Sequence, residues 1–362
     1  MAIEHDIIEY LSLTVEKGAS DLHLCAGSPV MVRRHGVMVP LSQDILDAET
    51  CREMIYGVFT ESQRSRFEET WELDFALMVT GLGRFRSNAH YSRGAVEAAF
   101  RHIPDKVPTM EQLGLPPVIK KLCTLEHGLV LVTGMTGSGK TTTLAAMVEE
   151  INATRSGVII SIEDPIEYVF KHNLCRVKQR EIGVDTKSFP EALRRVLHQD
   201  PDVILISEMR DLETISAAIT AAETGHLVLA TLHTIDAPKA IDRIIDVFPA
   251  DQQGQIIAQL ANCLQAIIAQ RLLPRADGRG RIVCVETLIM NDAIRALVRD
   301  RRFQQIISMM ELGSKEGMAT YDESVGALYA QGLITREEAL LNARNPVRIS
   351  QAKPLPPVPG GR

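Results

Sequence analysis

The residues best suited to chemistry lie in a glycine-rich loop at positions 134–142, which reads Gly-Met-Thr-Gly-Ser-Gly-Lys-Thr-Thr. The loop follows an apolar run at 129–132 and precedes an apolar helical pattern that begins at 144. A GxxxxGK[ST] pattern between a strand and a helix is typical of a phosphate-binding P-loop. The alternative, a chance glycine-rich turn, does not account for this context. The sequence therefore predicts a nucleotide site.

In such a loop the backbone N–H groups and the helix N-terminus face the phosphates of a bound nucleotide. Lys140 can neutralise the β- and γ-phosphates, and the Thr141 hydroxyl can bind Mg²⁺. We therefore expect ATP and Mg²⁺ as cofactors. The expected nucleotide-binding residues of the loop are Gly134, Thr136, Gly137, Ser138, Gly139, Lys140, Thr141 and Thr142.

Acidic residues follow two further apolar runs. Glu208 lies just past the run at 202–206 and is the candidate for polarising the attacking water. Asp202 begins that run and is too far back to hold the metal. Glu163 ends a neighbouring run and could share the water or bind Mg²⁺. Supporting acids follow it in the chain, namely Asp164 and Glu167. The alternative for each acid is a solvated carboxylate at a strand end.

Two histidines bracket a fourth apolar run. His226 and His233 are seven positions apart, and an odd spacing puts them on opposite faces of an extended strand. We therefore do not expect them to bind one metal ion. His233, at the carboxyl end, is better placed to sense the γ-phosphate, and both are candidate catalytic residues. The alternative is a structural histidine with satisfied hydrogen bonds.

Arginines are dense in the N-terminal third, at Arg84, Arg86, Arg93 and Arg101. We expect Arg84, Arg86 and Arg101 to reach a nucleotide in cis or in trans, because cations stabilise the charge that develops in phosphoryl transfer. A solvated strand face explains any single one of them as well. Arg210 can instead form a structural or interface ion pair.

The elements that must position these residues alternate after residue 128. Continuous apolar strands are predicted at 129–133, 157–162, 202–206 and 226–232, with helices between them. This pattern indicates a parallel sheet covered on both faces. Ligands of such sheets bind beyond the carboxyl ends of the strands, so the P-loop, both glutamates and His233 are expected to converge.

The remaining chain sets the domain organisation. Short alternating strands mixed with helices predict a small α+β domain over 1–102. A proline-bounded linker is expected at 103–108, an ATPase domain over 109–345 and a Pro-rich flexible tail over 346–362. The end of the ATPase domain is expected to be helical, at 293–299, 303–311 and 336–343. A long helical stripe is also expected there, formed by Ile256, Ile257, Leu260, Leu264, Ile267 and Ile268.

Composition limits the partners. The chain has 362 residues, a net charge of −7 and only 4% aromatic residues, which disfavours a nucleic-acid partner and a DNA-translocating ring. The six cysteines are scattered without a CxxC pair, as in reduced cytoplasmic proteins. No apolar run is long enough for a membrane span, and no basic segment opens a signal peptide. Any membrane role is therefore expected to act through a partner.

Together the motifs resemble the hexameric secretion and pilus motor ATPases, and among them the type IV pilus retraction (PilT-like) ATPases. The matching segments are 18–24, 134–142, the acidic box 162–167, 200–205 with 208–211, the histidine box 224–228 with 231–234, 241–244, 247–249 and 272–275. The resemblance covers nearly the whole chain apart from the tail.

The resemblance implies a PAS-like N-terminal domain before a RecA-like ATPase domain, and a homo-hexamer with ATP between domains and subunits. It implies Glu208 as the catalytic glutamate, Glu163 in support, and His226 and His233 as the histidine-box pair. It further implies cytoplasmic ATP hydrolysis that drives pilus retraction and twitching motility, peripheral to the inner membrane on the pilus platform protein. Pilus-extension and type II secretion relatives usually carry an extra N-terminal region and a tetracysteine zinc site, and the lack of CxxC pairs favours retraction.

Some positions depart from the family pattern. Ser207 stands where the family usually has glycine, and a C-terminal motif matches only partly, with Ala296 for asparagine and Asp300 for glutamate. These departures leave two alternatives to the retraction motor. One is an accessory or regulatory paralogue with weak turnover, acting beside a paralogous retraction ATPase, and the other is a pilus-assembly or type II secretion ATPase.

Overall fold

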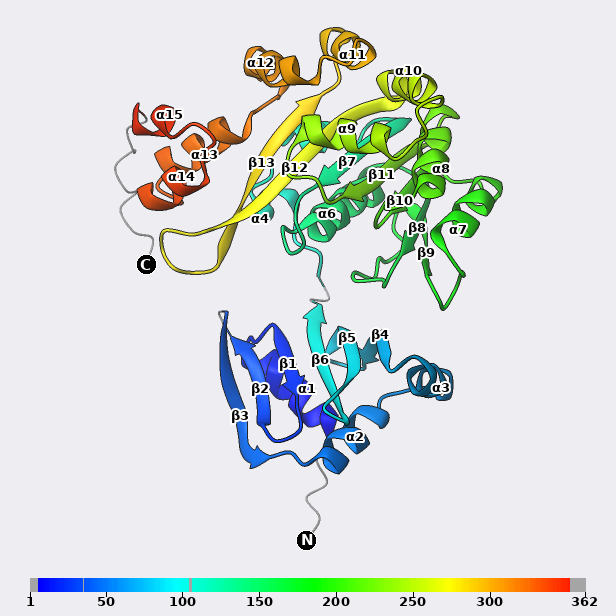
Figure 1. Ribbon diagram of the computed structural model, residues 1–362, viewed down its shortest axis with the longest axis vertical. Coiled ribbons are helices and arrows are strands. Elements are labelled where there is room, and N and C mark those ends of the chain that lie inside the picture. Colours follow the sequence, from blue (N-terminus) through cyan, green and yellow to red (C-terminus); the bar gives the residue numbers. More distant parts are fainter. Residues whose placement is uncertain (1–5, 35, 104–105, 352–362) are drawn as a thin grey trace. The chain divides into compact units, whose positions relative to one another are not determined.

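The computed structural model describes residues 6–34, 36–103 and 106–351 (Figure 1). The chain divides into two compact units. The first unit comprises Met1–Lys106 with Pro165–Val169, and the second comprises Val107–Asp164 with Phe170–Arg362. The predicted tail is described only as far as residue 351, and residues 104 and 105 of the predicted linker lie outside the described residues.

The first unit is an antiparallel sheet with helices. Its elements are α1 (Ile7–Glu16), β1 (Asp21–Leu24), β2 (Pro29–Arg34), β3 (Val37–Ile45), α2 (Ala48–Tyr56), α3 (Glu61–Thr70), β4 (Glu72–Val79), β5 (Gly83–Ser92) and β6 (Ala95–Ile103). The six strands follow the order β3-β2-β1-β6-β5-β4. The predicted small α+β domain is therefore confirmed.

Helix α3 was not anticipated from the sequence. Its only buried side chain is Phe67, so it carries no apolar stripe that periodicity could reveal. Its start is set instead by a capping box, in which Thr60 and Gln63 each satisfy the other's backbone N–H. Phe67 then packs with Phe85, Phe100 and other buried residues in the core of the unit.

The second unit carries the P-loop. Its elements up to the sheet's last strand are α4 (Met110–Leu113), α5 (Pro117–Leu122), β7 (Gly128–Thr133), α6 (Lys140–Thr154), β8 (Gly157–Glu163), β9 (Cys175–Glu181), α7 (Phe189–Val196), the 3-10 helix η1 (Leu197–Gln199), β10 (Val203–Ile206), α8 (Leu212–Glu223), β11 (Leu227–Leu232), α9 (Ala237–Asp246), α10 (Gln253–Cys263), β12 (Leu264–Pro274) and β13 (Arg281–Ile289). The seven strands lie in the order β13-β12-β7-β11-β10-β8-β9.

Helices cover both faces of this sheet, as the continuous apolar strands predicted. Helix α6 packs with α4 and α5, whereas α7, α8, α9 and α10 pack with one another. Alternate strand residues such as Leu129, Ile160, Ile204 and Val228 are fully buried in the core under α7–α10. The α/β, RecA-like fold class is confirmed.

The long helical stripe predicted through Ile268 is wrong in its second half. Helix α10 ends at Cys263, and Leu264 begins strand β12, which pairs in parallel with β7. Strand β13 then pairs antiparallel with β12. Most residues of β12 are buried, so its apolar residues form a run that periodicity cannot distinguish from a buried helix. The hairpin places β12 directly beside the P-loop strand.

Short helices complete the second unit. They are α11 (Asp292–Arg299), the 3-10 helix η2 (Phe303–Gln305), α12 (Ile306–Leu312), the 3-10 helix η3 (Ser314–Glu316), α13 (Tyr321–Ala330), α14 (Arg336–Asn342) and α15 (Pro346–Gln351). The helices predicted near 293–299, 303–311 and 336–343 are present, whereas α13 and α15 were missed. Helix α15 occupies the start of the predicted flexible tail, and its Ile349 is buried. In the part of the chain that the structure describes, no helix combines the length and apolar character that a membrane crossing requires.

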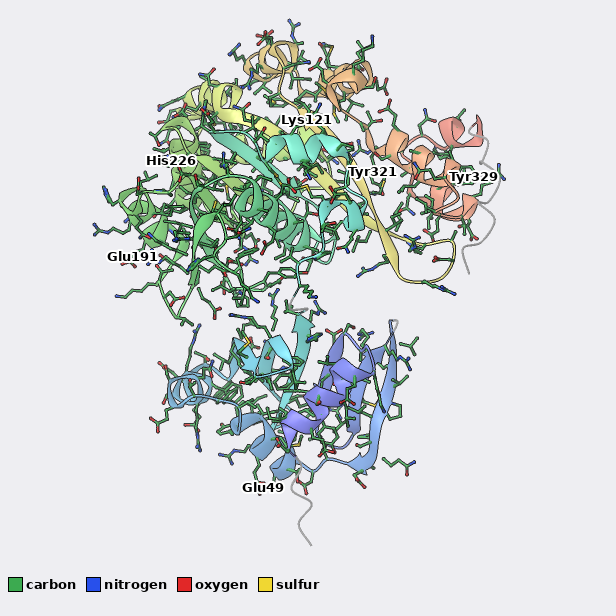
Figure 2. The ribbon with its side chains drawn as sticks, turned by 180° about the vertical axis from the view of Figure 1, so that it is seen from behind. Glu49, Lys121, Glu191, His226, Tyr321 and Tyr329 are labelled. Atoms are coloured by element: carbon green, nitrogen blue, oxygen red, sulfur yellow. The ribbon has the colours of Figure 1, made fainter. Side chains whose placement is uncertain are left out.

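A buried carboxylate joins the last helices to the sheet. Glu286 of β13 is fully buried and accepts hydrogen bonds from the backbone N–H groups of Ala237 and Tyr321, the first residues of α9 and α13. Arg344, past the end of α14, lies 3.1 Å from Glu286 and 3.5 Å from Asp236. Tyr321 is labelled in Figure 2. This cluster anchors the C-terminal helices beside the start of α9.

Candidate active site

The candidate catalytic side chains leave the carboxyl ends of four adjacent strands. The P-loop follows β7, His233 follows β11, Glu208 follows β10, and Glu163 ends β8. These four strands are neighbours in the order β7-β11-β10-β8. Parallel registers such as Thr133 opposite Leu232 keep their ends level. The structure therefore brings these segments to one edge of the sheet, where ligands of open α/β sheets bind.

The P-loop has the conformation that only glycine adopts readily. Gly134, Gly137 and Gly139 have φ values of 146°, 77° and 90°. Gly134 must also lack a side chain, since a Cβ atom there would lie 2.4 Å from the backbone oxygen of Gln270. The loop therefore turns tightly against β12 before α6 begins.

Lys140 is a buried cation at the start of α6. Its Nζ donates to the carbonyl oxygens of Gly134 at 2.9 Å and Met135 at 3.3 Å, so the end of the side chain lies beside the first residues of the P-loop. Burial of an ammonium is costly unless an anion or several acceptors compensate it. Glycines, a buried lysine and the following threonines form a donor set that fits a polyphosphate with Mg²⁺ on the Thr141 hydroxyl.

Glu163 is held by two side chains from its own edge of the sheet. It is 4% exposed, and its Oε1 accepts from Ser161 Oγ at 2.6 Å and from Gln179 Nε2 at 3.0 Å. Gln179 lies on β9, the edge strand that pairs with β8. These bonds keep the carboxylate in one orientation. Sequence reasoning did not identify Gln179, because β9 was not predicted and no motif contains it.

The Glu208 carboxylate contacts an imidazole and a guanidinium group, those of His233 and Arg210. His233 Nε2 lies 2.7 Å from Glu208 Oε1, and Arg210 Nε donates to the same oxygen. Burial acts to raise the pKa of Glu208, but the hydrogen bond from Arg210 and the interactions with His233 outweigh it, so the pKa lies below its usual value. The carboxylate is therefore ionised at neutral pH, as a group that polarises water must be.

The turn that carries Glu208 is tied to both neighbouring strands. Ser207 N–H donates to the carbonyl of Ile162, and Met209 N–H donates to that of Thr231. The Thr231 hydroxyl also donates to the Ser207 carbonyl. Asp202 precedes β10 at its other end, away from the P-loop edge, and accepts a hydrogen bond from Val158 N–H.

The structure does not bring His226 to this edge. It precedes β11, and its Nδ1 lies 3.0 Å from the carbonyl of Ala221 in α8 and 3.3 Å from Thr224 Oγ1 (Figure 2). The six residues of β11 separate it from His233. Six residues of strand span about 20 Å. Within one chain, only His233 of the predicted histidine pair lies with the glutamates.

The predicted arginines and Glu167 belong to the first unit. Arg86 NH1 lies 2.9 Å from Glu167 Oε1, within the segment Pro165–Val169 that belongs to that unit. Arg101 Nε lies 2.8 Å from Asp21 Oδ1, and the two residues are opposite each other in the pairing of β1 with β6. A nucleotide contact by Arg84, Arg86 or Arg101 stays a prediction.

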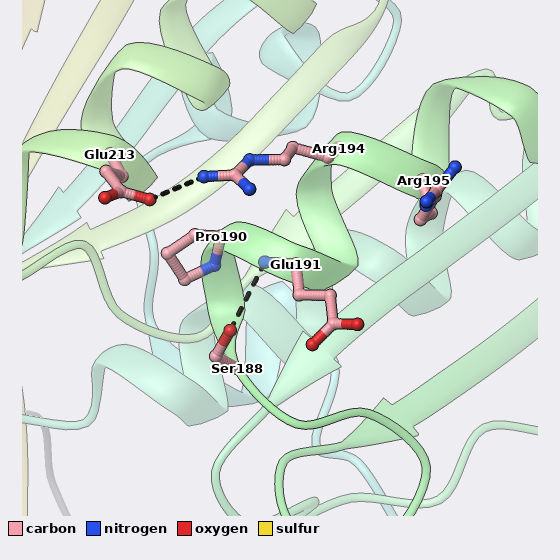
Figure 3. Close-up of a pocket in the computed structure, with 6 residues that line it drawn as sticks. All are labelled: Ser188, Pro190, Glu191, Arg194, Arg195 and Glu213. Atoms are coloured by element: carbon pink, nitrogen blue, oxygen red, sulfur yellow. Dashed lines mark hydrogen bonds and ion pairs between the residues drawn. The ribbon is translucent and has the colours of Figure 1, made fainter.

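A separate surface pocket of about 600 Å³ lies where α7 begins (Figure 3). Its lining residues are Ser188, Pro190, Glu191, Arg194, Arg195 and Glu213. Ser188 caps α7, and Arg194 lies 2.8 Å from Glu213. None of the predicted catalytic residues lines it, so we assign it no part in the chemistry.

Comparison with known proteins agrees with this fold. The family model described as type II/IV secretion system protein matches residues 108–341. The chain is 47% identical to the type IV pilus retractation ATPase PilT of Pseudomonas aeruginosa, over 94% of this chain and 99% of PilT. It is 45% identical to the type IV pilus ATPase PilU of the same organism, over 92% of this chain and 87% of PilU.

Among solved structures, the pilus retraction motor PilT with bound ADP superimposes with a TM-score of 0.88 at 47% identity, covering 96% of this chain and all of that one. The chain therefore belongs to the type II/IV secretion system protein family. Within that family it is PilT-like, since the similarity to PilT extends over both units, and the resemblance seen in the sequence is confirmed.

Proposed function

We propose that this chain is an ATP-hydrolysing motor that drives type IV pilus retraction. The observation that carries the proposal is the meeting of Lys140, Glu163, Glu208 and His233 at one sheet edge, in a chain that resembles PilT over nearly its full length. Each functional element of an ATPase, namely a phosphate loop, a carboxylate at a neighbouring strand and an ionised glutamate, has a residue here.

The residues divide the chemistry between them. The P-loop N–H groups and Lys140 bind the phosphates, and Glu208 polarises the attacking water. Glu163 is a second, oriented carboxylate that holds this water or the metal. Mg²⁺, bound through Thr141, supplies charge neutralisation at the phosphates. His233, in contact with Glu208, links the γ-phosphate side of the site to the catalytic carboxylate.

The assembly and location follow the resemblance. We propose a homo-hexamer that binds the platform protein of the pilus at the cytoplasmic face of the inner membrane. Arginines of the first unit, Arg84, Arg86 and Arg101, are the candidates for contacts to a nucleotide in cis or trans. The similarity to PilT is what supports a retraction role. In the described structure Arg86 and Arg101 each form an ion pair within the first unit, with Glu167 and Asp21.

Steady-state ATPase activity across protein concentration tests the enzyme and its assembly. We expect activity per subunit to rise with concentration and to fall by about 10²- to 10³-fold in Glu208→Gln, as for loss of a positioned acid–base group. Fluorescent ADP should still bind Glu208→Gln and should not bind Lys140→Ala. Wild-type protein that binds nucleotide without turnover at any concentration would contradict an independent motor, and Ser207→Gly would then be the next variant.

The biological role needs a second measurement. Expression in Pseudomonas aeruginosa that lacks its PilT should restore twitching, and Glu208→Gln should not restore it. Restoration only in the presence of PilU would point to an accessory role instead. Failure of the ATPase assay and failure of complementation are thus separate results.

A further inference from the structure

A buried glutamine lies under the P-loop. Gln270 is 2% exposed and sits on β12, one residue past the pairing of Ala269 with Thr133 at the end of β7. Its position is therefore next to Gly134, where the phosphate loop begins. No motif of the sequence analysis includes Gln270, since this stretch was expected to be helical.

Gln270 contacts the loop at its start and at its end. Its backbone oxygen approaches Gly134 so closely that a Cβ there would lie only 2.4 Å away. Its side-chain Nε2 donates to the carbonyl of Ser138 at 2.7 Å in a buried hydrogen bond. The same Nε2 would lie 3.2 Å from a Cβ on Gly139, the residue that caps α6. Gln270 thus contacts the P-loop from the β12 side near both of its ends, at Gly134 and at Ser138–Gly139.

The Ser138 hydrogen bond has a directional consequence. In a planar trans peptide, the carbonyl and the following N–H point in opposite directions. A donor that holds the Ser138 carbonyl on the β12 side therefore directs the Gly139 N–H to the other side of the loop. Backbone N–H groups on that side are what a P-loop offers to phosphate. The other carbonyls of the loop's start, those of Gly134 and Met135, are held by Lys140.

The side-chain amide of Gln270 donates a hydrogen bond through its nitrogen, but its oxygen accepts none from the part of the chain that the structure describes. Among the described residues, Gln270 Oε1 is buried with no hydrogen-bond partner, as are Ser138 Oγ of the P-loop and Thr133 Oγ1 at the end of β7. A buried polar atom without a partner destabilises the fold, so packing alone would favour an apolar side chain here. The donated bond to Ser138 is the contribution that an apolar residue could not replace.

We propose that Gln270 is a positioning residue for nucleotide binding, which orients the Ser138–Gly139 peptide so that its N–H faces the phosphates. The inference rests on the proposed function, because it concerns ATP binding at the same loop. Gln270 acts through the loop and does not itself touch the nucleotide. Its effect should appear with any ligand that carries a diphosphate.

The test compares wild type with Gln270→Met, which keeps length and volume but removes the donor, and with Gln270→Asn, which keeps the amide but is one methylene too short. Gln265→Met is the matched control, because Gln265 lies near the start of the same strand and bonds Arg295 instead. Fluorescent ADP affinity, competition by inorganic pyrophosphate, KM, kcat and the unfolding temperature are measured for each.

We expect both Gln270 variants to bind fluorescent ADP and pyrophosphate about five- to tenfold more weakly, the usual effect of one lost hydrogen bond. KM for ATP should rise similarly and kcat should change less, because the phosphate contact exists before and during the reaction. Gln265→Met should leave both affinities within twofold of wild type.

Affinity within twofold of wild type in Gln270→Met or Gln270→Asn would overturn the inference. So would an affinity loss that Gln265→Met shares, since it would report general damage to β12. If Gln270→Met does not fold, Gln270→Asn alone decides by the same criteria. Wild-type protein that fails to bind ADP would instead refute the proposed function, so the two failures are distinguishable.

Discussion

His233 Nε2 lies 2.7 Å from Glu208 Oε1, although the two residues follow different strands of the sheet. Strand β10 carries Glu208 to the same edge to which β11 carries His233, and these strands are parallel neighbours. The contact joins the residue best placed to polarise water to the residue best placed to sense the γ-phosphate. The contact with His233 is one of the interactions that lower the pKa of Glu208.

This relationship predicts a pH effect. In His233→Gln and in Arg210→Gln, one of the interactions that lower the pKa of Glu208 is lost while burial, which raises it, stays. The pKa of Glu208 should therefore rise. Because the ionised carboxylate is the active form, the acid limb of kcat/KM should move to higher pH in both variants, with a larger movement in the double variant. An unchanged acid limb would show that Glu208 does not control it.

Support of Glu163 by Gln179 gives a second prediction. Gln179→Met removes the 3.0 Å donor from the carboxylate and should lower kcat by about tenfold, the effect expected for a hydrogen bond to a charged group. Gln259→Met is the control, because Gln259 bonds Glu223 by a similar 2.7 Å contact away from the P-loop edge. Equal kcat values in the two variants would contradict the support of Glu163 by Gln179.

Two glycines of the P-loop provide a matched comparison. A Cβ at Gly134 would meet the Gln270 oxygen at 2.4 Å and Ser138 Oγ at 2.5 Å, whereas a Cβ at Gly137 meets nothing within 4 Å. Gly134→Ala should therefore abolish binding of fluorescent ADP. Gly137→Ala bears only the cost of a positive φ, about 1–2 kcal/mol, and should retain measurable binding. The reverse order of affinities would be inconsistent with the loop geometry.

The Glu286 cluster predicts the stability of the C-terminal helices. Arg344→Met leaves the buried Glu286 carboxylate without its cation and should lower the free energy of unfolding by about 1–3 kcal/mol in denaturant titrations. Arg336→Met is the control, because Arg336 is an exposed residue at the start of α14. Equal losses in the two variants would contradict the anchoring role.

The same cluster has a defined pH dependence. Burial raises the pKa of Glu286 in the folded protein, while Arg344 opposes the rise. Between the unfolded and the folded pKa of Glu286, the folded state holds a proton that the unfolded state has released. The stability that this proton contributes is therefore fully present below the unfolded pKa and is lost as pH rises through the folded pKa. Without Arg344 the folded pKa rises further, and the loss should extend to higher pH. Denaturant titrations at several acidic pH values would measure this, with Glu286→Gln lacking the effect.

The sequence alone determined the features that depend on local pattern. The glycine spacing before Lys140, the apolar strands and the acids or histidine at their carboxyl ends were sufficient to predict the P-loop, the α/β sheet and the convergence at one edge. These features follow from chain order, because parallel strands place their carboxyl ends on the same side.

Only the tertiary structure decided what surrounds these residues. Strand β12 was indistinguishable from helix because most of its residues are buried, and with it Gln270 was missed. Gln179 lies on an unpredicted edge strand, and His226 lies at the far end of β11. Glu163, Glu208 and the Ser138 carbonyl each have one partner distant in sequence, namely Gln179, His233 and Gln270. Side-chain contacts of that kind are set by strand order and packing, which no local pattern encodes.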